Sequence, residues 1–115
     1  MSQQNIALLA LPLALSGTVT ADRFVTAAGA QTGADGNAIG VARSGGVSGE
    51  KVTTDVVGTA IVEAGAAISA GATLKSDASG RAITWVTSGA RLGIALQAAT
   101  AAGQKIEVLL IPNAA

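Results

Sequence analysis

Histidine and cysteine are both absent from the 115 residues of the chain. The usual general base, the thiol nucleophile and the commonest zinc and transition-metal ligands are therefore missing together. Disulfide bonds are excluded as well, which fits a reducing cytosol but constrains the compartment only weakly. An enzyme would have to depend on Asp, Glu, Lys and Ser, which are few and scattered. The sequence therefore predicts a protein that is not an enzyme and has no metal site and no cofactor.

Aromatic residues are almost absent too, with one Phe, one Trp and no Tyr, although half of the chain is apolar. A domain of this size buries only about 60–70% of its unfolded surface, and each buried CH2 group contributes only about 0.8 kcal/mol. Much of the apolar half is alanine, so the predicted core is thin and the chain would gain stability from a partner surface. The net charge is zero and the seven basic residues are dispersed, so neither nucleic acid nor an anionic membrane is an expected partner.

The chain begins MSQQNIALLALPLALS, with an apolar run from Ile6 to Leu15. A signal peptide is disfavoured because no Lys or Arg precedes the run, Pro12 interrupts it, and about ten residues cannot span a bilayer. Proline favours an extended or edge conformation. We therefore expect an edge strand or an extended N-terminal arm over residues 1–17, followed by a single β-rich domain over residues 18–115.

From residue 18 onward, short runs rich in Val, Ile and Thr alternate with clusters of Gly, Ser, Asp and Asn. This pattern is typical of an all-β domain, here a small β-barrel or β-sandwich. Gly58 is expected to bend or bulge the longest strand. The segment EAGAAISA is expected to form one short helical turn over residues 63–70, ended by Gly71. The predicted strands are residues 18–26, 38–42, 51–62, 72–75, 82–87, 92–96 and 105–111.

Glycine-containing clusters predict the turns between these strands. Asp35 and Gly36 form a hairpin-turn signal because glycine tolerates the positive φ that such turns require. Trp85 is the only Trp, and we expect it to pack in the core or, less favoured, to anchor an interface. The glycines predicted to form turns are Gly36, Gly49, Gly71, Gly80 and Gly103.

The stretch SGGVSGEKVTT, residues 44–54, resembles at first sight a phosphate-binding loop. A P-loop needs Gly, four residues, and then Gly-Lys-Ser/Thr before a helix. Here Glu50 separates Gly49 from Lys51, a valine stands where the hydroxyl should be, and a β-rich run replaces the helix. The spacing Ser48-x-x-Lys51 of penicillin-binding enzymes also fails, because it needs a helical turn and two further motifs that are missing. Both catalytic interpretations are therefore rejected.

An internal repeat explains the same stretch. Residues 39–52 read IGVARSGGVSGEKV and residues 92–106 read LGIALQAATAAGQKI. Both contain aliphatic-Gly-aliphatic-Ala, a loop of small residues, and then Gly, Glu or Gln, Lys and an aliphatic residue. A loop that is used twice indicates architecture, so we predict two similar β-hairpins. Lys51 and Lys105 would begin the return strands and keep their rims soluble.

The order of these elements resembles the small capsid cement, or head decoration, proteins of tailed bacteriophages. The likeness runs from Ala38 to Ile111 and is most specific over residues 66–80, within EAGAAISAGATLKSDASGRAI. It implies a structural virion protein that binds the outer surface of the capsid and cements neighbouring major capsid protein subunits. It also implies a homo-oligomer, with a trimer favoured, which assembles in the host cytoplasm and needs no cofactor, no direct nucleic acid and no membrane.

The N-terminal arm is longer and more apolar than the typical start of that family. We expect it to pack on a neighbouring chain, either the major capsid protein or another cement subunit. The expected interface residues are Ile6, Leu8, Leu9, Leu11, Leu13 and Trp85.

Three other classes remain as alternatives. A carbohydrate- or ligand-binding β-module would usually present several aromatic rings, and this chain has few. A small enzyme is disfavoured because no pair of carboxylates stands at a readable spacing. An exported structural subunit would be recognised by cleavage of the N-terminal segment.

Overall fold

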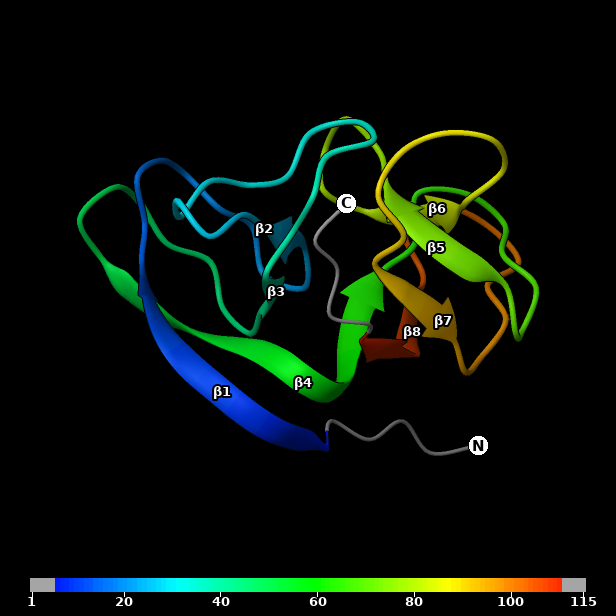
Figure 1. The fold of residues 1–115 in the computed structure, drawn as a ribbon, viewed down its shortest axis with the longest axis horizontal. Coiled ribbons are helices and arrows are strands. Elements are labelled where there is room, and N and C mark those ends of the chain that lie inside the picture. Colours follow the sequence, from blue (N-terminus) through cyan, green and yellow to red (C-terminus); the bar gives the residue numbers. More distant parts are fainter. Residues whose placement is uncertain (1–5, 111–115) are drawn as a thin grey trace.

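The structure, a computed structural model, describes residues 6–110, and within that range the chain folds without any helix (Figure 1). That range therefore contains no helix able to cross a membrane. The all-β prediction is confirmed, and the sheet is nearly closed into a barrel. The strands are β1 (Ala7–Ala14), β2 (Phe24–Val25), β3 (Gly40–Ala42), β4 (Lys51–Glu63), β5 (Thr73–Ser76), β6 (Ala82–Thr84), β7 (Gly93–Ala95) and β8 (Lys105–Leu110).

All seven predicted strand segments contain an observed strand. The predicted strand over residues 18–26 shortens to β2, because the backbone turns at Asp22, where φ is 62°. The apolar N-terminal run forms β1, which pairs antiparallel with β4 of the same chain. Its packing on a neighbouring chain and the division of the chain at residue 17 stay predictions.

The helical turn predicted over residues 63–70 is wrong. Ala64 and Ile68 instead form isolated bridges with Ala82 and Ala99. Both side chains are buried, and both backbone amides donate to carbonyl oxygens of the loop between β7 and β8, Ala64 to Gln104 and Ile68 to Ala99. The alanine-rich sequence favours a helix by propensity, but tertiary pairing satisfies these backbone groups and overrides that preference.

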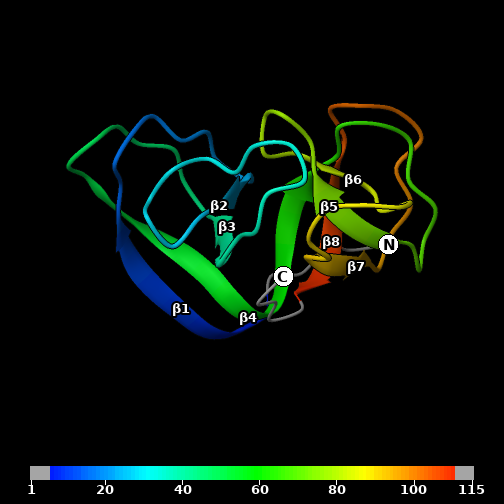
Figure 2. The ribbon, with the colours of Figure 1, turned by 45° about the horizontal axis from the view of Figure 1, so that its top comes forward.

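β4 is the longest strand and it holds the two halves of the sheet together. Its first part pairs with β1 and β3, and its second part pairs with β8. The full strand order is β2-β3-β4-β8-β7-β5-β6, with β1 added beside β4. Figure 1 shows β1, β2 and β3 on the left and β5 to β8 on the right, with β4 running from one group to the other, and Figure 2 shows the same division.

Gly58 lies where β4 bends, and the predicted irregularity is confirmed. Its φ is 107°, which favours glycine. The pairing register with β1 shifts on both sides of Leu9. A Cβ atom at Gly58 would collide with the carbonyl oxygen of Ile6. Glycine is therefore required for both the backbone angle and the close approach of β1.

The fold consists of two copies of one β unit that share β4. We call residues 7–58, with β1, β2, β3 and the first part of β4, the first unit, and residues 59–110, with the rest of β4 and β5 to β8, the second unit. Strand partners correspond one to one, with an offset that grows from 49 to 54 residues along the chain. The cross-strand pair Leu13–Val52 in the first unit corresponds to Val62–Ile106 in the second. In the same way, Phe24–Val41 corresponds to Thr73–Ile94, and Ala42–Thr54 corresponds to Ala95–Val108.

The two predicted hairpins are confirmed, and their loops are closed in the same way. The Glu50 carboxylate accepts a hydrogen bond from the Val47 amide at 2.8 Å, and the Gln104 side-chain oxygen accepts one from the Thr100 amide at 2.7 Å. Gly49, which precedes Glu50, has a φ of 93°, and Gly103, which precedes Gln104, has a φ of 92°. The shared Gly-Glu/Gln-Lys sequence is therefore a loop-closing motif.

Positive φ values also occur at other predicted turn glycines. The turn before Asn37 differs from the prediction, because the positive φ, 59°, falls on Asp35 and not on Gly36. Aspartate adopts this conformation more readily than most residues, and the Gly36 amide donates to the Gly33 carbonyl at 3.1 Å. The predicted turn glycines with positive φ are Gly49, Gly71, Gly80 and Gly103.

The buried residues form two clusters of unequal size. The smaller cluster lies in the first unit and consists of Leu15, Val19, Val25, Ala42 and Val52. The larger cluster fills the second unit and also includes Phe24 and Val41 of the first unit. The two units therefore share a core, and the first unit contributes its only aromatic ring to the second.

Candidate docking surface

Ion pairs connect the two units. Lys75 Nζ lies 2.7 Å from Asp35 Oδ1, and Lys105 Nζ lies 2.7 Å from Asp22 Oδ2. The hydrogen bond from Lys75 lowers the pKa of Asp35, and the hydrogen bond to Asp22 raises the pKa of Lys105. Pairs of this exposure contribute little individually. Among residues 6–110, no three Asp or Glu side chains gather as a metal site would require.

The buried carboxylate of Asp55 has a structural partner as well. It is 1% exposed and accepts a hydrogen bond from Arg43 Nε at 2.8 Å. A buried charge needs such a partner, because an unpaired carboxylate would be costly to desolvate. Because Asp55 pairs with Val41 across β3 and β4, its side chain lies on the same face of the first hairpin as Val41, which belongs to the larger cluster.

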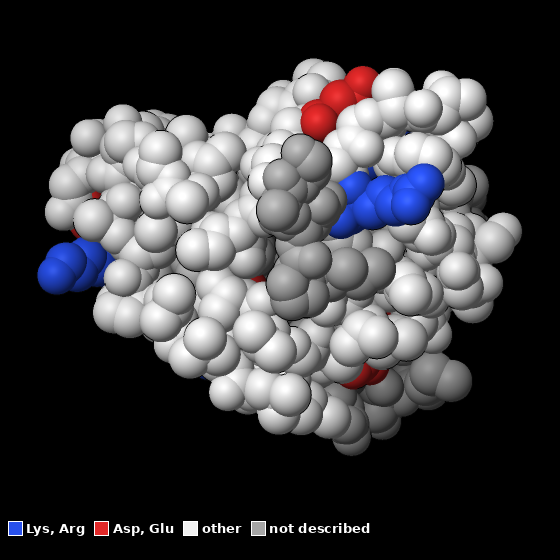
Figure 3. All heavy atoms as spheres, in the orientation of Figure 1, with Lys and Arg blue, Asp and Glu red and all other residues white. Residues whose placement is uncertain are grey.

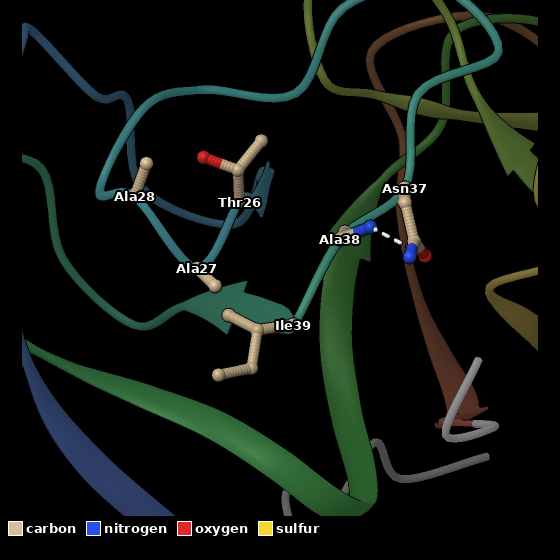
Figure 4. Close-up of a pocket in the computed structure, with 6 residues that line it drawn as sticks. All are labelled: Thr26, Ala27, Ala28, Asn37, Ala38 and Ile39. Carbon is tan, nitrogen blue, oxygen red and sulfur yellow. Dashed lines mark hydrogen bonds between the residues drawn. The ribbon is translucent and has the colours of Figure 1, made fainter. Parts of the chain in front are cut away.

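An open hollow of about 520 Å3 lies between the end of β2 and the start of β3 (Figure 4). Its polar groups serve the local backbone: the Thr26 hydroxyl accepts from the Ala30 amide at 3.2 Å, and the Asn37 side-chain oxygen accepts from the Ala38 amide at 3.0 Å. None of the lining side chains is ionisable. The lining residues are Thr26, Ala27, Ala28, Asn37, Ala38 and Ile39.

Large apolar side chains are exposed along β1. The exposed fraction is 77% for Leu8 and 38% for Leu11. β1 contains no charged residue, and Figure 3 shows few charged atoms on the face that carries it. Natural edge strands usually carry charges or irregularities that prevent association with other chains. We call this the β1 surface, and it consists of Ile6, Leu8, Leu9 and Leu11.

The other two expected interface residues lie elsewhere. Leu13 is half-buried and packs against the smaller core cluster. Trp85 follows β6 in the second unit, away from β1 (Figures 1 and 2). It is half-buried outside both clusters, which differs from the favoured core position, and its Nε1 donates to the Gly89 carbonyl at 2.9 Å. The Arg91 guanidinium lies 4.1 Å from the ring centroid, so one ring face is already occupied.

A second apolar surface was missed by the sequence analysis. Leu96 and Leu109 are exposed, and Ile94 is half-buried on the same face because it pairs with Leu109 across β7 and β8. We call this the β7–β8 surface, formed by Thr73, Ile94, Leu96 and Leu109. The repeat contained a signal for it: IGVARS aligned with LGIALQ places Arg43 opposite Leu96. An ion pair in one hairpin is therefore replaced by two exposed leucines in the other.

Comparisons with known proteins agree with this architecture. A family model described as phage cement protein matches residues 3–110. The fold is similar to the crystal structure of the head fiber gp8.5 N base in bacteriophage phi29, with a TM-score of 0.73 and 18% sequence identity. The likeness covers 91% of this chain and 95% of that chain. No curated protein matches the sequence.

Proposed function

The chain belongs to the phage cement protein family, and from this premise we propose that it binds the outer surface of a phage head and links neighbouring major capsid protein subunits. The observation that carries the proposal is the family match over residues 3–110. Membership of the family makes the chain a structural protein of the phage capsid. The proposal adds the partner and the mode of action.

The surface of the molecule supports a role in docking. A cement protein needs contact area, and the exposed apolar side chains of the described range concentrate on the β1 surface and the β7–β8 surface. A standard protein interface buries about 1,600 Å2. Many such contacts, repeated over a shell, stabilise it collectively. The thin core is compatible with this role because docking adds burial.

Binding to purified heads tests the proposal. Full-length protein is mixed with expanded heads that lack decoration, and occupancy is measured by densitometry after sedimentation. We expect saturable, stoichiometric binding and a higher temperature of head disruption. Undecorated heads that neither retain the protein above the level of an unrelated control protein nor gain heat resistance would refute the proposal.

The contribution of the N-terminal arm requires point substitutions. Deletion of residues 1–16 would remove the paired strand β1 and the buried Leu15, so loss of binding could reflect unfolding. Leu8→Ser changes only an exposed side chain, and Val86→Ser is a matched control at another exposed apolar position. If the arm contacts the capsid protein, Leu8→Ser lowers occupancy and Val86→Ser does not. Equal occupancy for both variants argues against direct contact of Leu8 with the shell.

A second candidate function is a base for a fibre on the head. The fold likeness to the phi29 head fiber N base favours it. Electron microscopy of decorated heads distinguishes the two candidates, because a cement protein gives compact surface knobs and a fibre base carries a long projection.

A further inference from the structure

The outer edge of β1 carries no further strand. Among the strands of residues 6–110, β1 pairs only with β4, and Figures 1 and 2 show it along the outside of β4. An exposed edge strand offers unpaired backbone groups to any extended chain. The sequence of β1, ALLALPLA, contains none of the charges that usually prevent such pairing. We propose that Pro12 closes this edge to strand addition, so that the β1 surface contacts other chains through its side chains alone.

Hydrogen bonds to β4 determine which backbone groups of β1 face outward. The Leu15 amide faces β4, because it donates to the Glu50 carbonyl oxygen at 2.8 Å. C-terminal to Ala10 the register of β1 with β4 has no shift, and the amides of an antiparallel strand face its two edges alternately. The amides of Leu13 and Leu11 therefore face β4 too. The amides at the positions between them face the free edge, and Ala10 has the same orientation.

Pro12 occupies one of these outward positions. Proline has no amide hydrogen, so the edge lacks a donor there. A carbonyl oxygen of an added strand would meet a CH2 group of the ring in place of that donor. Within sheets proline is tolerated where its nitrogen faces solvent, whereas proline at Leu11 or Leu13 would break a bond to β4. Pro12 therefore blocks the outer edge and leaves the pairing with β4 intact.

The rest of the edge is interrupted on both sides of Pro12. Toward the C-terminus, the Ser16 amide donates to the Gly29 carbonyl oxygen at 3.0 Å. A Cβ atom at Gly29 would collide with the outward carbonyl oxygen of Ala14, so the backbone of Gly29 covers that end. Toward the N-terminus, the register shifts on both sides of Leu9, and such irregularities hinder pairing. The regular, uncovered part of the edge is therefore the short stretch that contains Pro12.

The side chains of β1 explain why closure of the edge matters. Leu8 is 77% exposed and Leu9 is 48% exposed. Apolar, uncharged segments without proline are the ones that add to strands of other chains. With the edge closed, the exposed leucines stay accessible to the side chains of a partner. This holds whichever protein the partner is, so the inference does not rest on the capsid binding proposed above.

Amide hydrogen exchange in the full-length protein tests the proposal. Exchange of labelled wild-type protein is followed by NMR over a series of protein concentrations. We expect slow exchange at Leu11 and Leu13, whose amides face β4, and fast exchange at Ala10 at every concentration. Protection of the Ala10 amide that grows with protein concentration would overturn the proposal, because it would show that another strand pairs with the edge.

Pro12→Ala restores the missing donor. Slow exchange at Leu11 and Leu13 shows that this variant keeps the fold. We expect the Ala10 amide to become protected and half-association in light scattering to occur at a concentration roughly 30-fold lower than for the wild type, because two copies paired edge to edge gain one hydrogen bond each. A folded variant with wild-type association and fast exchange at Ala10 would contradict the proposal.

The matched control moves the proline along the same edge. Pro12→Ala combined with Ala10→Pro keeps the number of outward donors of the wild type, since Ala10 also faces outward and is exposed. We expect this double variant to return to the association of the wild type. Association as strong as that of Pro12→Ala alone would overturn the proposal, because the missing outward donor would then have no effect.

Discussion

Replacement of Gly49 or of Gly103 by alanine is expected to destabilise the protein by the same amount. The two residues have φ values of 93° and 92°, and a Cβ atom at either position would meet nothing within 4 Å. The cost is therefore conformational, and it amounts to about 1–2 kcal/mol for an L-residue with positive φ. In a domain of this size it corresponds to a fall in Tm of roughly 4–10 °C.

Urea unfolding followed by circular dichroism measures these costs, with all variants at one protein concentration because association shifts apparent stability. Gly58→Ala is the informative comparison, since it adds the collision with the Ile6 carbonyl oxygen to a φ of 107°. It should therefore cost more than either turn variant. A difference above about 0.5 kcal/mol between the two turn variants, beyond the usual scatter for independent sites, would refute the equivalence of the hairpins.

Three further predictions concern single side chains. Glu50→Gln should leave stability unchanged, because glutamine closes the other loop with the same bond, whereas Glu50→Ala should cost about 0.5–1.5 kcal/mol in urea unfolding. Leu74→Ala should cost about 2–5 kcal/mol, since Leu74 is fully buried, and thermal unfolding would show it. Asp35→Asn should lower the free energy of unfolding at neutral pH. Because the pKa of Asp35 is lowered in the folded protein, its carboxylate contributes stability above about pH 3.8, and this contribution is lost as the pH falls below that value. Urea unfolding curves of the wild type and of Asp35→Asn should therefore differ at neutral pH and converge in acid.

The local features of the fold could be predicted from the sequence. Turn residues and β-branched runs located the strands, and Gly58 marked the bend in the longest one. The prediction of a helical turn over residues 63–70 was wrong, because the helix propensity of alanine is a weak local preference. The β-bridges of Ala64 and Ile68 that replace the helix are long-range contacts. Short patterns contain no information about such partners.

The candidate surfaces were predictable in part. The apolar residues before Pro12 indicated the β1 surface, although the pairing of this segment with β4 depends on residues about 40 positions away. The β7–β8 surface was not recognised, because single exposed leucines are common on protein surfaces. Its position only becomes meaningful when Leu96 and Leu109 are compared with Arg43 and Asp55 in the matching hairpin.

The sharing of β4 has a mechanical consequence. The β1 surface and the β7–β8 surface are connected through β1, β4 and β8, which are joined by backbone hydrogen bonds along their lengths. A pull between the two surfaces is transmitted through this ladder without crossing a loop. Many hydrogen bonds share such a load, so the two surfaces can be drawn apart only by shearing strands past one another. The molecule is therefore stiff along the line that joins the two surfaces.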